Sequence, residues 1–147
     1  MTRRVRALEA RDEAAWRRLF QGYIQFYKAE IAADVIEASW RQLLSSEVGS
    51  HFGLVAVDAE DCPIGIAHVL FHRSTWAKTC YCYLEDLFVD PRARGAGAGR
   101  ALIEAVYAEA DKRGATRTYW ATQEFNTRAR ALYDELATKS PFVQYRR

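Results

Sequence analysis

The chain has 147 residues, a length typical of one compact domain, and we expect residues 1–147 to form a single domain. Its 21 basic and 19 acidic residues leave a formal net charge of +2, which argues against nucleic acid or a membrane surface as a partner. Its three cysteines and three histidines stand at no metal-binding spacing. No apolar run reaches the length of about 18 residues that a membrane span needs, and no leader segment is evident. We therefore expect a cytoplasmic protein with reduced thiols and no metal.

Apolar periodicity in the first half of the chain predicts one strand, two helices and a hairpin. A short strand is expected at 4–8, followed by helical periodicity over 10–28 and 33–44. The residues of the second helix that are expected to face the core are Val35, Ile36, Trp40, Leu43 and Leu44. The period then changes to two over 52–57 and 64–72, and the turn-forming segment between these runs predicts a β-hairpin.

The second half of the chain predicts a strand, a glycine-rich loop, a helix and another strand. The first strand is expected at 79–89, the helix continues to Arg113 and stops at Gly114, and the next strand spans 116–122. A β-α-β order makes the two strands parallel neighbours. The whole order predicts an α/β (α+β) domain with a mixed, mostly antiparallel twisted sheet and helices on both faces.

The glycine-rich loop has the properties of an anion-binding device. Gly95, Gly97 and Gly99 lack Cβ atoms, so several backbone N–H groups can approach one phosphate, and the following helix adds its positive end. A P-loop would end in Gly-Lys-Ser/Thr, but Gly99 is followed by Arg100, and the glycine spacing does not match a dinucleotide-binding turn. The pattern that remains is R-x-x-G-x-G, which begins at Arg94.

Three motifs in the second half of the chain together resemble the GNAT superfamily of N-acetyltransferases. They are L-E-D-L-F-V at 84–89, R-x-x-G-x-G at 94–99 and N-x-x-A-R-x-L-Y at 126–133, each on the type of element that the family requires. The form of the first motif resembles the spermidine/spermine and small histone-and-polyamine acetyltransferases. The resemblance implies acetyl-CoA as cosubstrate and transfer of the acetyl group to an amine.

Two residues are candidates for the acid–base chemistry of acetyl transfer. An alkyl ammonium with a pKa of about 10.4 must lose a proton before it attacks, and by resemblance Glu85 is the base that removes it, directly or through water. The alternative is a carboxylate that pairs with an arginine, either Arg117 or Arg128. Tyr133, a phenol that stays protonated at neutral pH, resembles the family's general acid for the leaving thiolate. The alternative for Tyr133 is a core position.

The resemblance also implies how acetyl-CoA is held. The backbone N–H of Leu87 is expected to donate to the developing oxyanion, and the main chain of Leu87 and Val89 to pair with the pantetheine arm. Asn126 is expected to cap its helix or to contact the pantetheine amides. Arg92 or Arg94 is a candidate to meet the adenosine 3′-phosphate, and the alternative for both is a solvated loop charge. The complete expected set is Leu87, Phe88, Val89, Arg94, Gly95, Ala96, Gly97, Ala98, Gly99, Arg100, Asn126 and Arg130.

The acceptor amine is expected to approach an aromatic and acidic surface. Tyr23 and Tyr27 offer ring faces that attract a cation, although their spacing also fits a core role. In a regular strand Glu85 shares a face with Leu87, while Asp86 points to the opposite face and so has a structural or ammonium-binding role unless a bulge rotates it. A polyamine-like or amino-acid-like primary amine fits this surface.

Two other functions and an assembly state follow from the same residues. A protein or histone lysine acetyltransferase would need an open groove, and a non-catalytic acyl-CoA sensor would keep the loop without turnover. The segment after Leu136 lacks the glycine with which the family commonly starts its next turn, so a last strand is not expected. An unpaired sheet edge would remain, and we expect a homodimer or larger homo-oligomer to cover it.

Overall fold

The computed structural model describes residues 4–45 and 51–147 and contains one twisted five-stranded sheet. Its strands, in the spatial order in which they pair, are β1 (Arg4–Ala7), β2 (Phe52–Val57), β3 (Pro63–His72), β4 (Tyr81–Val89) and β5 (Arg117–Tyr119). The first four strands are antiparallel neighbours, and β5 runs parallel to β4. These pairings confirm the mixed, mostly antiparallel sheet, including the parallel pair of the β-α-β unit.

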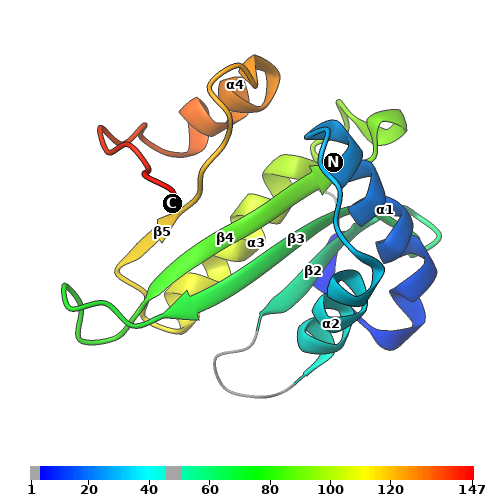
Figure 1. Ribbon diagram of the computed structural model, residues 1–147, viewed down its shortest axis with the longest axis horizontal. Coiled ribbons are helices and arrows are strands. Elements are labelled where there is room, and N and C mark those ends of the chain that lie inside the picture. Colours follow the sequence, from blue (N-terminus) through cyan, green and yellow to red (C-terminus); the bar gives the residue numbers. More distant parts are fainter. Residues whose placement is uncertain (1–3, 46–50) are drawn as a thin grey trace.

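Helices cover both faces of this sheet (Figure 1). The helices are α1 (Glu13–Phe26), α2 (Ala33–Leu44), α3 (Ala98–Lys112) and α4 (Thr127–Leu136), and single 3₁₀ turns, η1 (Ala10–Asp12) and η2 (Pro91–Ala93), precede α1 and α3. One core cluster, built around Trp16, joins α1 and α2 to the sheet, and a second cluster around Leu102 joins α3 to the opposite face. In the described part of the chain, no helix is both long and apolar enough to cross a bilayer.

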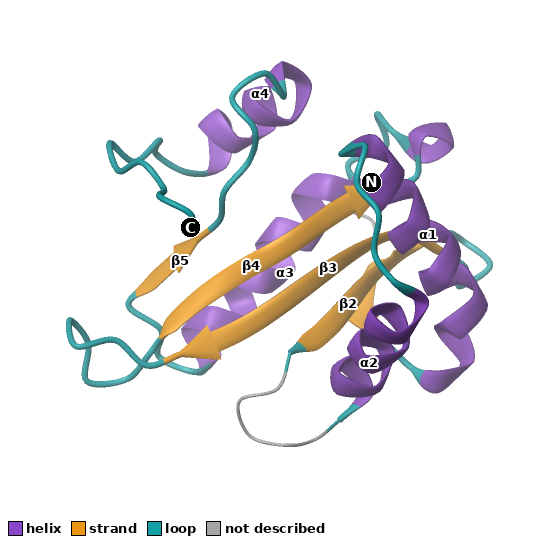
Figure 2. Cartoon of the chain, viewed as in Figure 1, coloured by secondary structure: helices purple, strands orange, loops and turns teal. Residues whose placement is uncertain are grey.

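Three differences from the expected elements have local causes. Val35 and Leu44 are 51% and 38% exposed because α2 packs through its other side, where Trp40 and Leu43 are buried. The first helix ends at Phe26, since Lys28 takes a left-handed φ of 53°. The last strand is only Arg117–Tyr119, after which the chain leaves the sheet and continues toward α4 (Figure 2).

A β-bulge interrupts β4 at Glu85. Leu84 pairs with Val69 and Asp86 pairs with His68, the next residue of β3. Glu85 is therefore an extra residue of β4 without a partner in that register. The strand bends here, and the Glu85 side chain is exposed.

The bulge reverses which side chains of β4 face which helices. Leu84 packs in the α3 cluster, and regular alternation would send Asp86 to that side too. Instead Phe88 joins the α1 cluster, Leu87 packs on the α3 side, and Asp86 contacts His68 beneath α1. The faces expected for a regular strand, with Glu85 and Leu87 together and Asp86 opposite, therefore do not apply, and the alternative of a bulge that rotates Asp86 is confirmed.

An ion cluster ties the first strand to the start of α1 and to the β2–β3 turn. Arg6 donates two hydrogen bonds to the carboxylate of Asp12, of 2.8 Å and 2.9 Å, and its Nε donates a third, of 3.1 Å, to Asp61. The hydrogen bond from Arg6 is the main cause that lowers the pKa of Asp12, and the same guanidinium lowers the pKa of Asp61 to about 2. Both carboxylates therefore stabilise the fold only while they are ionised.

Asp12→Asn should lower the free energy of unfolding at neutral pH by about 3 kcal/mol, because it breaks a buried ion pair. Because folding lowers the pKa of Asp12, the stabilisation is complete above the unfolded pKa of about 4 and is lost as the pH falls through the lower folded pKa. Urea unfolding across this range should show a flatter acid limb for Asp12→Asn than for the wild type. Glu60→Gln, on the exposed turn, is the matched control; an acid limb of equal slope in Asp12→Asn would contradict the assignment.

Candidate active site

A cavity of about 410 Å³ opens where the end of β4 meets α4. Four parts of the chain line it: the end of α1, the end of β4, the glycine loop with the start of α3, and α4. The lining residues are Tyr23, Phe26, Tyr27, Leu87, Phe88, Val89, Arg94, Gly95, Gly97, Ala98, Gly99, Arg100, Asn126, Arg128, Ala129, Leu132 and Tyr133. Most of the sequence-predicted site residues therefore converge on one cavity.

The cavity exists because β4 and β5 separate. Their parallel pairing ends at Tyr83 opposite Tyr119, whereas β4 continues to Val89. Beyond Tyr83, the β4 edge has no strand partner on that side among the described residues. Leu87 and Val89 on this edge line the cavity, so an extended ligand can add to the edge as another strand would.

The glycine loop forms an open cradle at the start of α3. Gly95 and Gly97 take φ values of 87° and 81°, which only glycine adopts without strain, and Gly97 is the N-cap of α3. A Cβ built on either glycine would meet no atom within 4 Å, so the loop faces open space. The first N–H groups of α3 have no acceptor within the helix and are available to an anion at its N-terminus. The cradle fits the pyrophosphate of a coenzyme A derivative.

Gly97→Ala should raise the KM for acetyl-CoA about tenfold with a smaller change in kcat, because the methyl group strains the left-handed backbone and fills the cradle. Gly114→Ala is the matched control. Gly114 also has a left-handed φ, of 71°, but lies beyond the other end of α3. Steady-state kinetics with acetyl-CoA as the varied substrate would decide; an equal rise in both variants would mean that strain alone is responsible.

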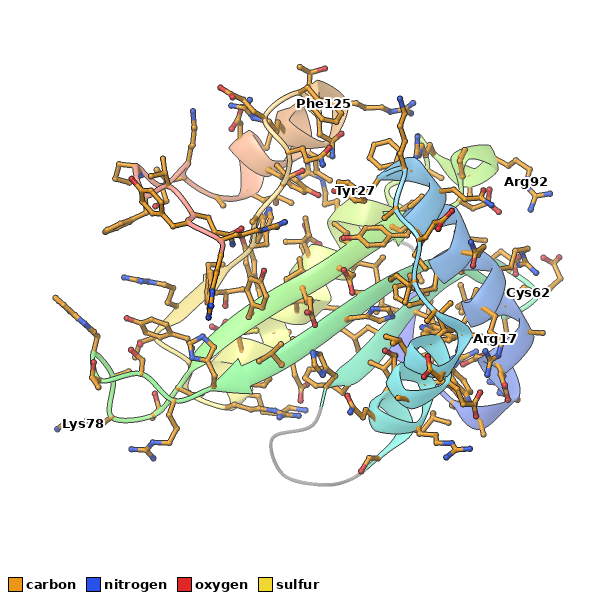
Figure 3. All side chains as sticks on the ribbon, viewed as in Figure 1. Arg17, Tyr27, Cys62, Lys78, Arg92 and Phe125 are labelled. Atoms are coloured by element: carbon orange, nitrogen blue, oxygen red, sulfur yellow. The ribbon has the colours of Figure 1, made fainter. Side chains whose placement is uncertain are left out.

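The arginines near the cradle differ in what they face. Arg94 lines the cavity with its guanidinium 5.8 Å from the Phe88 ring centroid. Arg92 pairs with Asp90, is 81% exposed and points away from the body of the protein (Figure 3). Of the two candidates for a 3′-phosphate, the geometry therefore favours Arg94.

Arg100 and Arg130, the other two arginines of the predicted set, already have partners within the protein. Arg100 lines the cavity and forms an ion pair with Glu135 of α4. Arg130 donates a 2.7 Å hydrogen bond to the carbonyl of Glu124 and does not line the cavity. Arg130 therefore shapes the loop before α4, which is a structural role that the motif alone did not indicate.

Asn126 and Tyr133 face the cavity from the same side of α4, as their spacing predicts. Asn126 occupies the N-cap position, but its side chain makes no cap bond; its Nδ2 donates to Thr122 Oγ1 at 3.1 Å. The ring of Tyr133 packs edge-on against Trp120, with centroids 5.4 Å apart. Burial, with a smaller contribution from Tyr27, raises the pKa of Tyr133 to about 12, so its phenol is protonated at neutral pH.

Tyr23 and Tyr27 form the wall opposite α4. Their ring centroids are 5.0 Å apart in an edge-to-face contact, and Figure 3 shows Tyr27 near the end of β4. Burial raises the pKa of Tyr23, and the negative charge and hydrogen bond of Asp86 raise it further. Both tyrosines line the cavity, so neither is solely a core residue.

Glu85 lies outside the lined cavity, on the bulge. Its carboxylate pairs with a histidine rather than with an arginine: His51 Nε2 lies 2.5 Å from Glu85 Oε2. The guanidinium of Arg117 instead stacks over Tyr81, at 4.6 Å. With 43% of its side chain exposed, Glu85 can exchange protons with solvent, which suits a base that acts through water.

A buried histidine beside Asp86 is the part of the site that sequence reasoning missed. His68 is only 4% exposed, its Nδ1 lies 2.8 Å from Asp86 Oδ2, and its Nε2 accepts a 2.9 Å hydrogen bond from the Trp16 indole. The sequence offers no signal for this contact, because the partners come from α1, β3 and β4. Only the bulge at Glu85 turns Asp86 to the same side.

Comparison with known proteins shows the family of this chain. Residues 13–137 match the acetyltransferase (GNAT) family. D-amino-acid N-acetyltransferase HPA3 of Saccharomyces cerevisiae is 38% identical over 97% of this chain and 89% of the yeast protein. The chain therefore belongs to the GNAT family of acetyltransferases, which confirms the family and the class of enzyme that the three motifs indicate.

Other relatives match in part or in fold. Thialysine N-epsilon-acetyltransferase of Bos taurus is 36% identical over 53% of this chain and 45% of the bovine protein. The structure of AAC(6′)-Iy with the bisubstrate analogue CoA-S-monomethyl-acetylneamine superposes with a TM-score of 0.82 at 20% identity, covering 100% of this chain and 98% of that one. The second likeness concerns the fold alone.

Proposed function

We propose that this enzyme transfers the acetyl group of acetyl-CoA to the amine of a small polyamine-like or amino-acid-like molecule. One observation carries the proposal: the free edge of β4, the open glycine cradle and the Tyr133 phenol all border one cavity. GNAT enzymes use acetyl-CoA, and the cavity offers an edge for an amide-containing arm next to a cradle for its phosphates. Acetyl-CoA, when bound, supplies the activated thioester.

Residues on two elements would divide the proton transfers. Glu85, exposed on the bulge, accepts the proton of the ammonium through water so that the free amine can attack the carbonyl carbon. The backbone N–H of Leu87 on the free edge donates to the oxyanion. Tyr133, kept protonated by its buried position, gives its proton to the departing thiolate.

The walls of the cavity favour a small cationic acceptor. Tyr23, Phe26 and Tyr27 present aromatic rings, which attract an ammonium group. The names of the relatives agree: one is a D-amino-acid N-acetyltransferase and another a thialysine N-epsilon-acetyltransferase. Both names denote acetylation of a molecule of amino-acid size.

Mass spectrometry of an amine panel incubated with acetyl-CoA tests the choice of acceptor. The panel contains polyamines, L- and D-amino acids, thialysine, aminoglycosides and a lysine-rich peptide. We expect acetylated product from one of the small-amine classes. Acetylation of the peptide alone would instead support a protein lysine acetyltransferase, and coenzyme A binding without any product would support a non-catalytic sensor.

We also propose that residues 1–147 act as one cytoplasmic domain and that two copies form a homodimer. The sheet ends at β5, which is only three residues long, and irregular chain with exposed apolar side chains follows α4. Phe142, Val143 and Tyr145 are 85%, 76% and 91% exposed. A second copy that covers this segment and the β5 edge would remove both from water.

Light scattering during size-exclusion chromatography should give the mass of a dimer for the wild type. Phe142→Ser with Val143→Ser should shift the protein toward the monomer. Trp76→Ser is the matched control, because Trp76 is 88% exposed but lies in the β3–β4 loop. A monomeric wild type at high protein concentration would contradict the proposal.

A further inference from the structure

We infer that Trp16 and His68 are positioning residues of the acceptor site. They hold the Asp86 carboxylate beneath Tyr23, where its negative charge acts on the ammonium group of the acceptor. This inference rests on the proposed amine acetylation and adds to it two buried residues that touch neither substrate.

The bulge in β4 places Asp86 at the start of this chain of contacts. Asp86 lies directly opposite His68 of β3, and both side chains face α1. The Asp86 side chain is 20% exposed, while those of His68 and Trp16 are almost completely buried. The carboxylate is thus the end of the chain that is nearest to solvent.

The donors and acceptors at Trp16, His68 and Asp86 fix the direction of the two hydrogen bonds that join them. The indole N–H of Trp16 only donates, so His68 Nε2 is the acceptor of their 2.9 Å bond. The ring proton of neutral His68 is then on Nδ1, from which it is donated to Asp86 Oδ2 at 2.8 Å. With the imidazole fixed at both nitrogens, neither its tautomer nor its orientation can change without breaking a buried hydrogen bond.

Packing connects this chain to the cavity. Phe20 contacts both His68, with centroids 5.1 Å apart, and Tyr23, with centroids 6.3 Å apart. Tyr23 lines the cavity, and burial together with the negative charge of Asp86 raises the pKa of its phenol.

The chemistry of the Trp16–His68–Asp86 contacts argues against a purely stabilising role. A buried histidine–carboxylate pair contributes little net stability compared with apolar residues of similar volume, because both groups must be desolvated. The distinct effect of the pair is geometric. The hydrogen bond from His68 holds Oδ2 of Asp86 in place, and this fixes the orientation of the whole carboxylate. This is the function of a group that supports a charge-bearing residue.

A double-mutant cycle separates positioning from simple packing. Asp86→Asn and His68→Leu should each raise the KM for the amine about tenfold, with less than a threefold change in the Kd for coenzyme A. If His68 acts through Asp86, His68→Leu should add almost nothing in the Asp86→Asn background. His68→Asn, whose amide N–H can replace Nδ1–H, should restore most of the affinity for the amine.

Trp16→Phe tests the far end of the chain and keeps an aromatic ring in the core. Its amine KM should rise severalfold, and ¹⁵N NMR should show that His68 loses its exclusive Nδ1–H tautomer. Trp40→Phe is the matched control, because Trp40 is also a buried tryptophan of this cluster and its ring contacts Trp16, with centroids 5.1 Å apart. Trp40→Phe should leave the His68 tautomer and the amine KM unchanged.

Three outcomes would overturn the inference. The first is an Nε2–H tautomer of His68 in the wild type. The second is wild-type turnover with additive effects of His68→Leu and Asp86→Asn; the proposed function would then stand without the positioning role. The third is the absence of turnover on every amine despite binding of coenzyme A, which would overturn the proposed function and this role with it. Where His68→Leu does not fold, Trp16→Phe in the wild-type and Asp86→Asn backgrounds supplies the same comparison.

Discussion

Tyr133→Phe is expected to lower kcat by about 10²- to 10³-fold and to leave the Kd for coenzyme A unchanged. The phenol borders the cavity, and burial raises its pKa to about 12, so it carries a proton for the leaving thiolate at every ordinary pH. Phenylalanine keeps the ring that packs on Trp120 and removes only the hydroxyl group that carries this proton. Steady-state kinetics at saturating amine, together with calorimetry for coenzyme A, measures both quantities.

Tyr107→Phe is the matched control for this result. Tyr107 is also half-buried with a raised pKa, but its hydroxyl donates to the Leu136 carbonyl at 2.8 Å and it does not line the cavity. The control should lose some stability and keep its kcat. Equal kcat values for wild type and Tyr133→Phe would show that the thiolate takes its proton from another source.

Glu85→Gln is expected to lower kcat/KM for the amine about 100-fold near pH 7, where an alkyl amine is almost completely protonated. The deficit should shrink as the pH approaches about 10, because the free amine then forms in solution and needs no base. The pH dependence of kcat/KM for wild type and variant, measured with the same amine, tests both statements.

Glu104→Gln, which changes an exposed carboxylate on α3, should match the wild type across the whole pH range. A Glu85→Gln deficit that stays constant up to about pH 10 would contradict the assignment of Glu85 as the group that removes the ammonium proton. No deficit at any pH would leave Asp86 as the carboxylate to test next.

Elements with a strong period could be predicted from the sequence. The bounds of α2, the hairpin and the parallel pairing of β4 and β5 agree with expectation, since each rests on a local pattern of apolar residues and turn formers. The glycine loop was equally readable, because its left-handed φ values at Gly95 and Gly97 require glycine. Asn126 and Tyr133 reach one cavity because a helix brings residues seven apart to the same side.

The carboxylates of the site could not be placed in the same way. Glu85 and Asp86 are adjacent in sequence, and only a bulge set by pairing with β3 decides which of them faces α1. The partners of these carboxylates, His51 and His68, come from other strands or from the segment before one. Such contacts depend on tertiary register, which no local pattern encodes.

The rate of coenzyme A thiol release from acetyl-CoA, with and without an amine, tests the central claim most directly. We expect slow release without acceptor and a much faster, saturable release with one class of small amine. The same slow rate with every amine would contradict an N-acetyltransferase that uses this cavity for turnover.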